Sequence, residues 1–274
     1  MPSKSSRRSD ASRLRAVVVH SESARNMGII RESISHINNI AHGIDFKVER
    51  FPRKKISDNV LSALIGLRLT DPNKRDARAF DSFALRDFER RVLADEATAR
   101  GVPYEACGLM RFYREFLNGA NELFPAIHVI VSDRLLMSWS EDDSRYHARA
   151  ILLGLPCIIS MSGLVEAPAR PREYYLEKQA IGILGGTDVS LKRRFAGKYL
   201  EFDDERTPTV LGGYILQCLF YAMTGEAFCD DRDCMLFNAH WQEEMLHAQI
   251  ESGKLCARHQ KMLTRHVSLL KRPS

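Results

Sequence analysis

The 274-residue sequence contains no long apolar run. None of its segments approaches the roughly 18–20 uninterrupted apolar residues that a membrane-spanning helix needs. The first 15 residues, MPSKSSRRSDASRLR, also lack the apolar stretch of a secretory signal peptide. We therefore expect a cytoplasmic protein, in which cysteines serve as thiols or metal ligands rather than as disulfides.

Sequence motifs for phosphate binding and for a serine nucleophile are also missing. The glycine-rich segment Gly182–Thr187 matches neither the GxGxxG nor the P-loop spacing, and it is predicted to be a tight turn. Ser160 and Ser162 lie at the end of a short apolar run, but no GxSxG elbow surrounds them. The sequence therefore offers neither a recognisable phosphate-binding loop nor an activated serine.

Charge is distributed unevenly along the chain, whose formal net charge is +5. Residues 1–15 carry a net charge of +4 and residues 258–274 one of +5, so the segment between them is mildly acidic. We predict a disordered basic tail at 1–15, a single domain at 16–259 and a basic C-terminal tail at 260–274. No aromatic side chains accompany the N-terminal charges, so nucleic acid should bind only non-specifically through the tails.

Apolar periodicity predicts an α/β fold. Leu14–His20 is a β-branched run typical of a buried strand, Asn26–His42 has apolar residues at helical spacing, and Ile44–Phe51 alternates as a second strand. A strand–helix–strand start favours helices layered on a sheet. Further helices are predicted at Val60–Leu69, Phe83–Arg100 and Tyr104–Leu123, and further strands at Ala126–Ser132 and Pro156–Met161.

A strongly apolar helix is predicted later in the chain. Thr207 and Pro208 supply an N-cap and a first-turn proline, and Gly225 supplies a C-terminal stop. Apolar residues occupy almost every face between these ends. The helix should therefore be buried, and it leads directly to Cys229.

Four candidate metal ligands follow that helix. Cys229 and Cys234 form a Cys-x4-Cys pair, and Cys256 and His259 form a Cys-x2-His pair. A Cys3His set completes a tetrahedral shell around zinc and leaves no position for water. Such a closed shell is typical of a structural zinc site rather than a catalytic one.

An alternative remains open for these cysteines, because buried cysteine is also a common small core residue. Cys107 and Cys157 are expected to be buried thiols of that kind. If His259 points away from the other ligands, His266 is the reserve ligand.

Over about 209–259, from the buried helix to the last ligand pair, the order of features resembles the archaemetzincins, a metzincin-type family of zinc peptidases. Their pattern HExxHxxGxxHC-x4-C is followed by a CxxC pair that completes a structural zinc site. Gly225, Cys229 and Cys234 lie at matching positions. Cys256 matches the first cysteine of the last pair, and His259 replaces the second. The resemblance implies a metzincin-like mixed sheet with packed helices, one structural zinc and a small zinc-stapled lobe at about 225–260.

The same resemblance implies that the catalytic residues have been lost. The three histidines of the active-site zinc would lie at Cys218, Ala222 and Phe228, and the general-base glutamate at Leu219. None of these side chains can hold a catalytic zinc in the family's manner or accept the proton of its water. The sequence therefore predicts a non-catalytic zinc protein that serves as a peptide or protein interaction module.

A divergent metal-dependent peptidase or hydrolase is the alternative. On a helix, His240, Glu243, Glu244 and His247 would share one face and could rebuild a metal site. Seven positions separate the two histidines, about 10.5 Å of helical rise, so both cannot bind one ion from a straight helix. His240 with Glu244, or Glu243 with His247, could each form half of a site. The other interpretation is a solvated face with His–Glu pairs at i,i+4.

Overall fold

The computed structural model describes residues 16–52, 56–117, 126–184 and 188–270. Within them the main sheet has five strands in the order β2-β1-β4-β8-β7. The first four are parallel, and β7 is antiparallel at the edge, which confirms the expected mixed sheet. The strands are β1 (Ala16–Ser21), β2 (Asp45–Arg50), β4 (Ala126–Ser132), β7 (Ile151–Leu152) and β8 (Cys157–Ser160).

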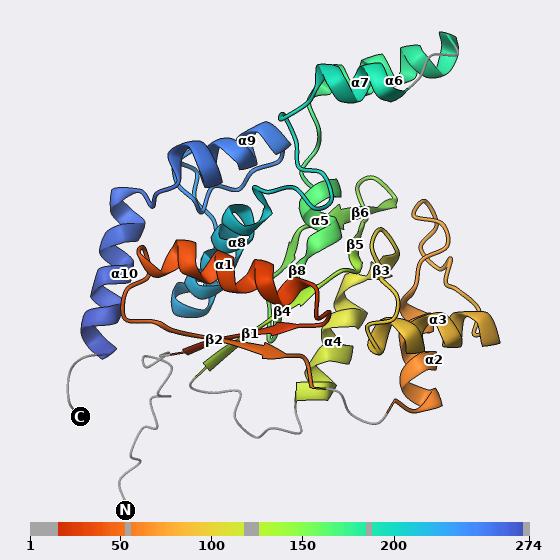
Figure 1. Cartoon of the computed structure of the whole chain (residues 1–274), viewed down its shortest axis with the longest axis horizontal. Coiled ribbons are helices and arrows are strands. Elements are labelled where there is room, and N and C mark those ends of the chain that lie inside the picture. The colour runs from red at the N-terminus through yellow and green to blue at the C-terminus, as the bar shows by residue number, and fades with distance from the viewer. Residues whose placement is uncertain (1–15, 53–55, 118–125, 185–187, 271–274) are drawn as a thin grey trace, which may run out of the picture.

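Helices cover both faces of this sheet (Figure 1). Successive side chains of a strand point to opposite faces, so β4 contributes to two separate cores. Val129 and Val131 pack with α1 and α8, whereas Ile130 packs with α4, α2 and α3. These helices are α1 (Asn26–Asn38), α2 (Asp58–Leu67), α3 (Phe83–Leu93), α4 (Ala106–Leu117) and α8 (Thr207–Thr224).

Three further strands form a second sheet in the order β3-β5-β6. β3 (Pro103–Glu105) is parallel to β5 (Leu135–Ser140), and β5 forms an antiparallel hairpin with β6 (Arg145–Arg149). The hairpin leads directly into the edge strand β7. The chain then passes through β8 into the short helix α5 (Met161–Glu166).

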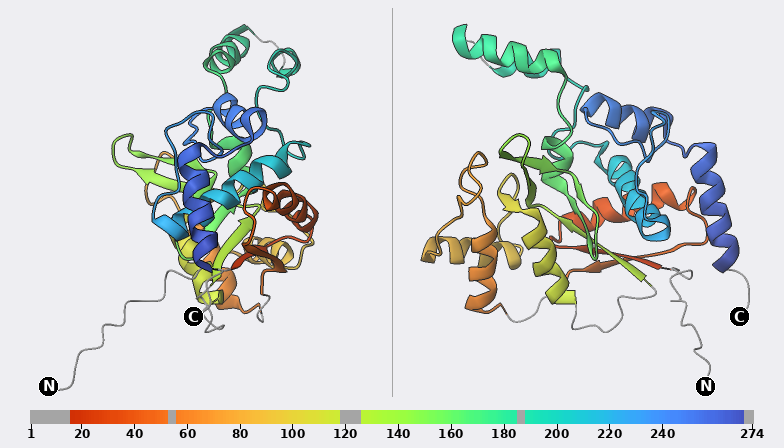
Figure 2. Two further views of the ribbon diagram at one scale, coloured as in Figure 1. Left: turned by 90° about the vertical axis from the view of Figure 1, so that its left-hand side faces the viewer. Right: turned by 180° about the vertical axis from the view of Figure 1, so that it is seen from behind.

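Two helices, α6 (Arg172–Leu184) and α7 (Asp188–Arg194), form an arm that projects from the rest of the molecule (Figures 1 and 2). The Arg170 guanidinium lies over the rings of Tyr174 and Tyr199 at the base of the arm, 4.9 and 4.5 Å from their centroids. The arm has a small core of its own, made by Tyr174, Leu191, Phe195 and Tyr199.

The central helix α8 ends at Gly225 as predicted, but Thr207, expected as its N-cap, is its first helical residue, and Arg206 takes the cap position without a side-chain hydrogen bond. Pro208 lies in its first turn, and Gly225 ends it in a left-handed conformation with φ of 78°. Gly212 allows a close approach to α1, because an added Cβ would lie 2.8 Å from the Ile37 side chain. The next residue, Gly213, would place a Cβ only 1.5 Å from the Gln249 side chain. Two successive glycines therefore admit neighbours on two sides of the helix.

The C-terminal part comprises α9 (Gln242–Leu246), the π-helix η2 (His247–Ser252) and α10 (Ala257–Leu270). The region 260–274, expected as a basic tail, is helical as far as Leu270. The remaining 271–274 and the predicted tail 1–15 lie outside the described residues. No helix in the described part of the chain is both long and apolar enough to cross a membrane.

A charged cluster is buried beyond the carboxyl ends of β1 and β4. The Arg134 guanidinium is fully buried and donates to Glu22 at 2.9 Å and to Glu89 at 2.8 Å. Ser132 donates to Glu22, and Tyr104 donates to Glu89. Buried charges are tolerated when they are paired and hydrogen-bonded in this way.

Some predicted boundaries were wrong. The helix expected at Phe83–Arg100 ends at Leu93, because Asp95 adopts a positive φ of 65° and its carboxylate pairs with Arg50. Cys107 is exposed rather than buried, since it lies on the outer face of the amphipathic helix α4.

Two other segments continue helices or lie beyond the described residues. The turn expected at Gly182–Thr187 begins within α6, which runs to Leu184, and 185–187 lie outside the described residues. The helix expected at Tyr104–Leu123 is α4 as far as Leu117, and 118–123 are likewise not described.

A histidine pair in which His20 is buried should make stability depend on pH. His20 Nε2 lies 2.8 Å from His128 Nδ1, and burial, followed by the charge of His128, lowers the pKa of His20 to about 4. The unfolded chain, with an ordinary histidine pKa of about 6.5, then binds more protons between pH 6.5 and 4. Stability should fall as pH is lowered through this window, by up to about 3 kcal/mol.

Urea unfolding between pH 7 and pH 4 measures this dependence. His20→Gln should flatten it, while His42→Gln, at an exposed position, should leave it unchanged. Equal pH slopes for the wild-type protein and His20→Gln would contradict the assignment to His20.

Candidate metal centre and adjoining groove

The structure brings Cys229, Cys234, Cys256 and His259 together. One ligand atom from each lies within 4.8 Å of all the others. The Sγ atoms of Cys229 and Cys256 are 3.9 Å apart, and His259 Nδ1 lies 3.7 Å from Cys234 Sγ and 3.1 Å from Cys256 Sγ. His259 therefore occupies the fourth position, and the reserve ligand His266 is not part of the cluster.

The donor set fits a metal such as zinc. A tetrahedral zinc with bonds of about 2.3 Å to sulfur separates two sulfur ligands by about 3.8 Å, close to the Cys229–Cys256 distance. Burial raises the pKa of Cys234 to about 12, so this thiol stays protonated in the absence of a cation. A bound metal would release thiol protons and balance the thiolate charge.

The backbone holds the first cysteine pair in a tight loop. The N–H of Cys229 donates to the carbonyl oxygen of Leu236 at 2.7 Å, which closes the loop around Cys234. The N–H groups of Asp231 and Cys256 donate to Cys229 Sγ and Cys234 Sγ, each at 3.4 Å. These donors point at sulfur and favour the thiolate form.

The second ligand pair stands at the start of α10. Cys256 immediately precedes this helix, and His259 lies in its first turn. The His259 ring is buried edge-on against Phe220 of α8, with centroids 5.3 Å apart. The lobe at about 225–260, here called the metal lobe, is thereby joined to the core of the domain.

The four positions implied for catalysis have different surroundings. Cys218 and Leu219 are fully buried in the core, and Ala222 packs against it. Burial raises the pKa of the Cys218 thiol well above its ordinary value, and Cys157, buried as predicted, lies beside it. Phe228 is 39% exposed. These side chains offer core packing and an apolar surface instead of imidazole and carboxylate groups.

The alternative metal set does not assemble. Helix α9 begins at Gln242, so His240 precedes it and does not share a helix face with the others. Glu244 instead caps α9, accepting from the N–H groups of His240 and Trp241 at 3.1 and 3.2 Å. The expectation of one helical face was therefore wrong, because the cap turns the chain just before the helix.

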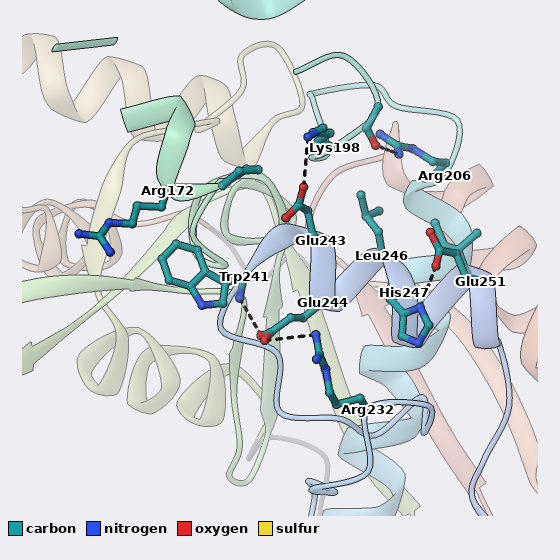
Figure 3. Close-up of a pocket in the computed structure, with 13 residues that line it drawn as sticks. Arg172, Lys198, Arg206, Arg232, Trp241, Glu243, Glu244, Leu246, His247 and Glu251 are labelled. Carbon is teal, nitrogen blue, oxygen red and sulfur yellow. Dashed lines mark hydrogen bonds and ion pairs between the residues drawn. The ribbon is translucent and has the colours of Figure 1, made fainter. Parts of the chain in front are cut away.

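Glu243 and His247 are held by other partners (Figure 3). Glu243 pairs with Lys198 at 3.7 Å. His247 lies between Asp233 and Glu251, 2.7 Å from each, and its hydrogen bonds with Glu251 and Asp233 raise its pKa. Both nitrogens of the His247 ring are therefore already engaged by carboxylates. Among the described residues, the Cys3His cluster is the one set of three or more ligands that converges.

Glu243, Glu244 and His247 line a cavity of about 660 Å³ beside the base of the arm. Figure 3 shows both acidic and basic side chains in its wall, with Lys198 joined to Glu243 and Arg232 to Glu244. Most charged side chains of this wall are therefore paired with a side chain of opposite charge. His240 lines a different cavity.

That second cavity, here called the β7 groove, was not foreseen from the sequence. It measures about 400 Å³ and lies between the edge strand and the buried helix. Ile151 and Leu152 of β7 form one wall, and Tyr214 and Gln217 of α8 line it from the core. The opposite wall belongs to the metal lobe and includes Phe228, Phe237 and Ala239. In the sequence, the apolar run Ile151–Leu153 is the one feature that could have indicated this groove.

The comparisons with known proteins concern nearly the whole chain. Residues 14–266 match the family described as "Probable metallopeptidase family (DUF6775)". Similar solved structures include archaemetzincin from Methanopyrus kandleri, with 12% identity, a TM-score of 0.45, and coverage of 95% of this chain and 99% of that one. A zinc-dependent peptidase from Methanocorpusculum labreanum has 13% identity, a TM-score of 0.39, and coverage of 90% and 99%. A search of curated proteins gives no match.

Proposed function

Because the chain belongs to the probable metallopeptidase family DUF6775, we propose that it is a non-catalytic member, which holds one structural zinc and binds extended peptides in the β7 groove. The observation that carries this proposal is the β7 groove itself, which lies between an edge strand and apolar side chains such as Phe228 and Phe237. Of the four positions at which the archaemetzincin motif would place its metal ligands and base, Phe228 lines this groove, and Cys218 and Leu219 are buried in the core.

The zinc of the Cys3His cluster would have a structural role. Four protein ligands fill a tetrahedral shell, so no position remains for a substrate or a reactive water. Zinc there would supply only a cross-link between the loop after α8 and the start of α10. Peptide hydrolysis by a metal needs an open coordination position and a base, and Leu219 provides no base where the motif places one.

The groove suits an extended peptide because one of its walls is an edge strand. β7 pairs with β8 on one side, and within the described residues no other strand pairs with it. An edge strand can bind a peptide as an added strand, with backbone hydrogen bonds for affinity and pockets for alternate side chains. Phe228 and Phe237 provide apolar surface for those side chains.

We expect the purified protein to bind members of a hexapeptide library without cleaving them, and to contain one zinc per chain. Ala239→Trp should weaken peptide binding at least tenfold, because the indole fills the groove. Fluorescence anisotropy measures the binding, mass spectrometry of the incubated peptides measures cleavage, and elemental analysis measures zinc.

Ala196→Trp is the matched control, since the same bulk is added at an exposed position on the arm. It should bind peptides as the wild-type protein does. Chelator-sensitive cleavage by a preparation with two zinc ions per chain would overturn the non-catalytic assignment. Equal binding by Ala239→Trp and Ala196→Trp would show that peptides bind elsewhere.

A further inference from the structure

Gln217 is an unusual residue of the β7 groove. It lies on α8 and is only 2% exposed, yet its Oε1 has no hydrogen-bond partner. It lines the groove together with Tyr214 and Phe228. A buried amide oxygen without a partner is costly. Gln249 Oε1 also lacks a partner, but Gln249 lines none of the cavities described above, so Gln217 is distinguished by its place in the groove.

Another buried glutamine shows what a structural amide looks like in this fold. Gln242 Oε1 accepts from the N–H of Leu200 at 3.0 Å, and its Nε2 donates to the carbonyl oxygen of Leu164 at 2.9 Å. Both ends of that amide are used to join segments of the chain. Gln217 has no such role for its oxygen and lines a cavity.

We propose that Gln217 determines which peptides the groove accepts, by pairing its amide with an uncharged polar side chain of the ligand. The inference rests on the proposed function, since it requires a peptide along β7. In an added strand, alternate side chains point to one face, and those facing α8 meet Gln217. Asparagine, glutamine, serine and threonine can donate a hydrogen bond to its oxygen.

The surroundings restrict the ligand further. An aliphatic side chain at this point would leave the Gln217 oxygen unpaired, and sites built around a polar contact reject analogues that lack it. A cationic side chain would lose its hydration among apolar groove residues such as Ile151 and Phe237, with no carboxylate in the groove lining to pair with it. A carboxylate could pair with Arg149 of the lining, but it has no hydrogen to donate to the Gln217 oxygen. The groove therefore selects an uncharged hydrogen-bond donor at one position within an otherwise apolar peptide.

The test compares Gln217→Met with the wild-type protein on a positional-scanning hexapeptide library. Methionine keeps the length of glutamine and removes its amide. The wild-type protein should prefer Asn, Gln, Ser or Thr over Leu at one position by tenfold or more, and Gln217→Met should reverse or abolish that preference. Without peptide, Gln217→Met should raise the melting temperature by about 2–4 °C, since the unpaired oxygen is removed.

Gln242→Met is the matched control and should lower the melting temperature, because both of its hydrogen-bonded ends are lost. An unchanged side-chain preference in Gln217→Met, with peptides still bound, would overturn the role of Gln217 and leave the proposed function intact. A melting temperature lowered as much as in Gln242→Met would also overturn it. If the wild-type protein binds no library peptide, the proposed function fails and this inference with it.

Discussion

Cys234→Ser is expected to unfold the C-terminal lobe and lower the melting temperature of the protein by more than about 10 °C. Structural zinc contributes on the order of 10 kcal/mol in small zinc-binding peptides, which is comparable to the whole stability of a domain. Serine is a poor zinc ligand, and at this fully buried position it also places a hydroxyl among apolar groups. Circular dichroism melting and elemental analysis of the purified variant measure both effects.

Cys107→Ser is the control, because Cys107 is an exposed cysteine outside the cluster. Its melting temperature and zinc content should match those of the wild-type protein. A strong chelator should lower the melting temperature of the wild-type protein to near that of Cys234→Ser. A Cys234→Ser variant that melts at the wild-type temperature would mean that these thiols merely pack together.

The second large effect concerns the buried arginine. Arg134→Leu should destabilise the protein by about 3–5 kcal/mol, because Glu22 is left buried without its cation and Glu89 keeps only the longer 3.5 Å pair with Arg68. For a protein of this size the loss corresponds to roughly 10 °C in melting temperature. Urea unfolding measures the change.

Arg90→Ala supplies the comparison, because Arg90 makes only ion pairs of 3.9 Å at the surface and should change stability by less than about 1 kcal/mol. Replacing the whole cluster, with Glu22→Gln and Glu89→Gln added to Arg134→Leu, should recover part of the loss. A triple variant no more stable than Arg134→Leu would assign the effect of Arg134→Leu to lost packing instead of unpaired charge.

Local sequence patterns were sufficient to predict much of the main sheet and the metal cluster. The β-branched run before His20 and the helical spacing after Asn26 are properties of short segments, and both elements form as expected. Pro208 and Gly225 set the ends of α8 through backbone preferences that need no tertiary information. The ligand pairs Cys-x4-Cys and Cys-x2-His could likewise be read from their spacing.

Features that depend on distant parts of the chain could not be predicted. β7 has only two residues and exists because β8 pairs with it. Glu22, Glu89 and Arg134 each look like surface residues, and nothing local indicates that they meet in the interior. His240 lies outside α9 because the Glu244 carboxylate accepts a hydrogen bond from the backbone N–H of His240 and caps the helix after it. This side-chain cap replaces the helical hydrogen bonds that the sequence pattern predicts.

The buried Arg134 cluster also bears on where a ligand can bind. β1 is flanked by β2 on one side and β4 on the other, with α1 and α4 on opposite faces of the sheet. In open α/β sheets, the crevice between the carboxyl ends of two such strands is the usual ligand site, at the topological switch point. Here the chain fills that crevice with its own guanidinium and two carboxylates. The site common to doubly wound sheets is sealed from within, which leaves the antiparallel edge at β7 as the place for the proposed peptide.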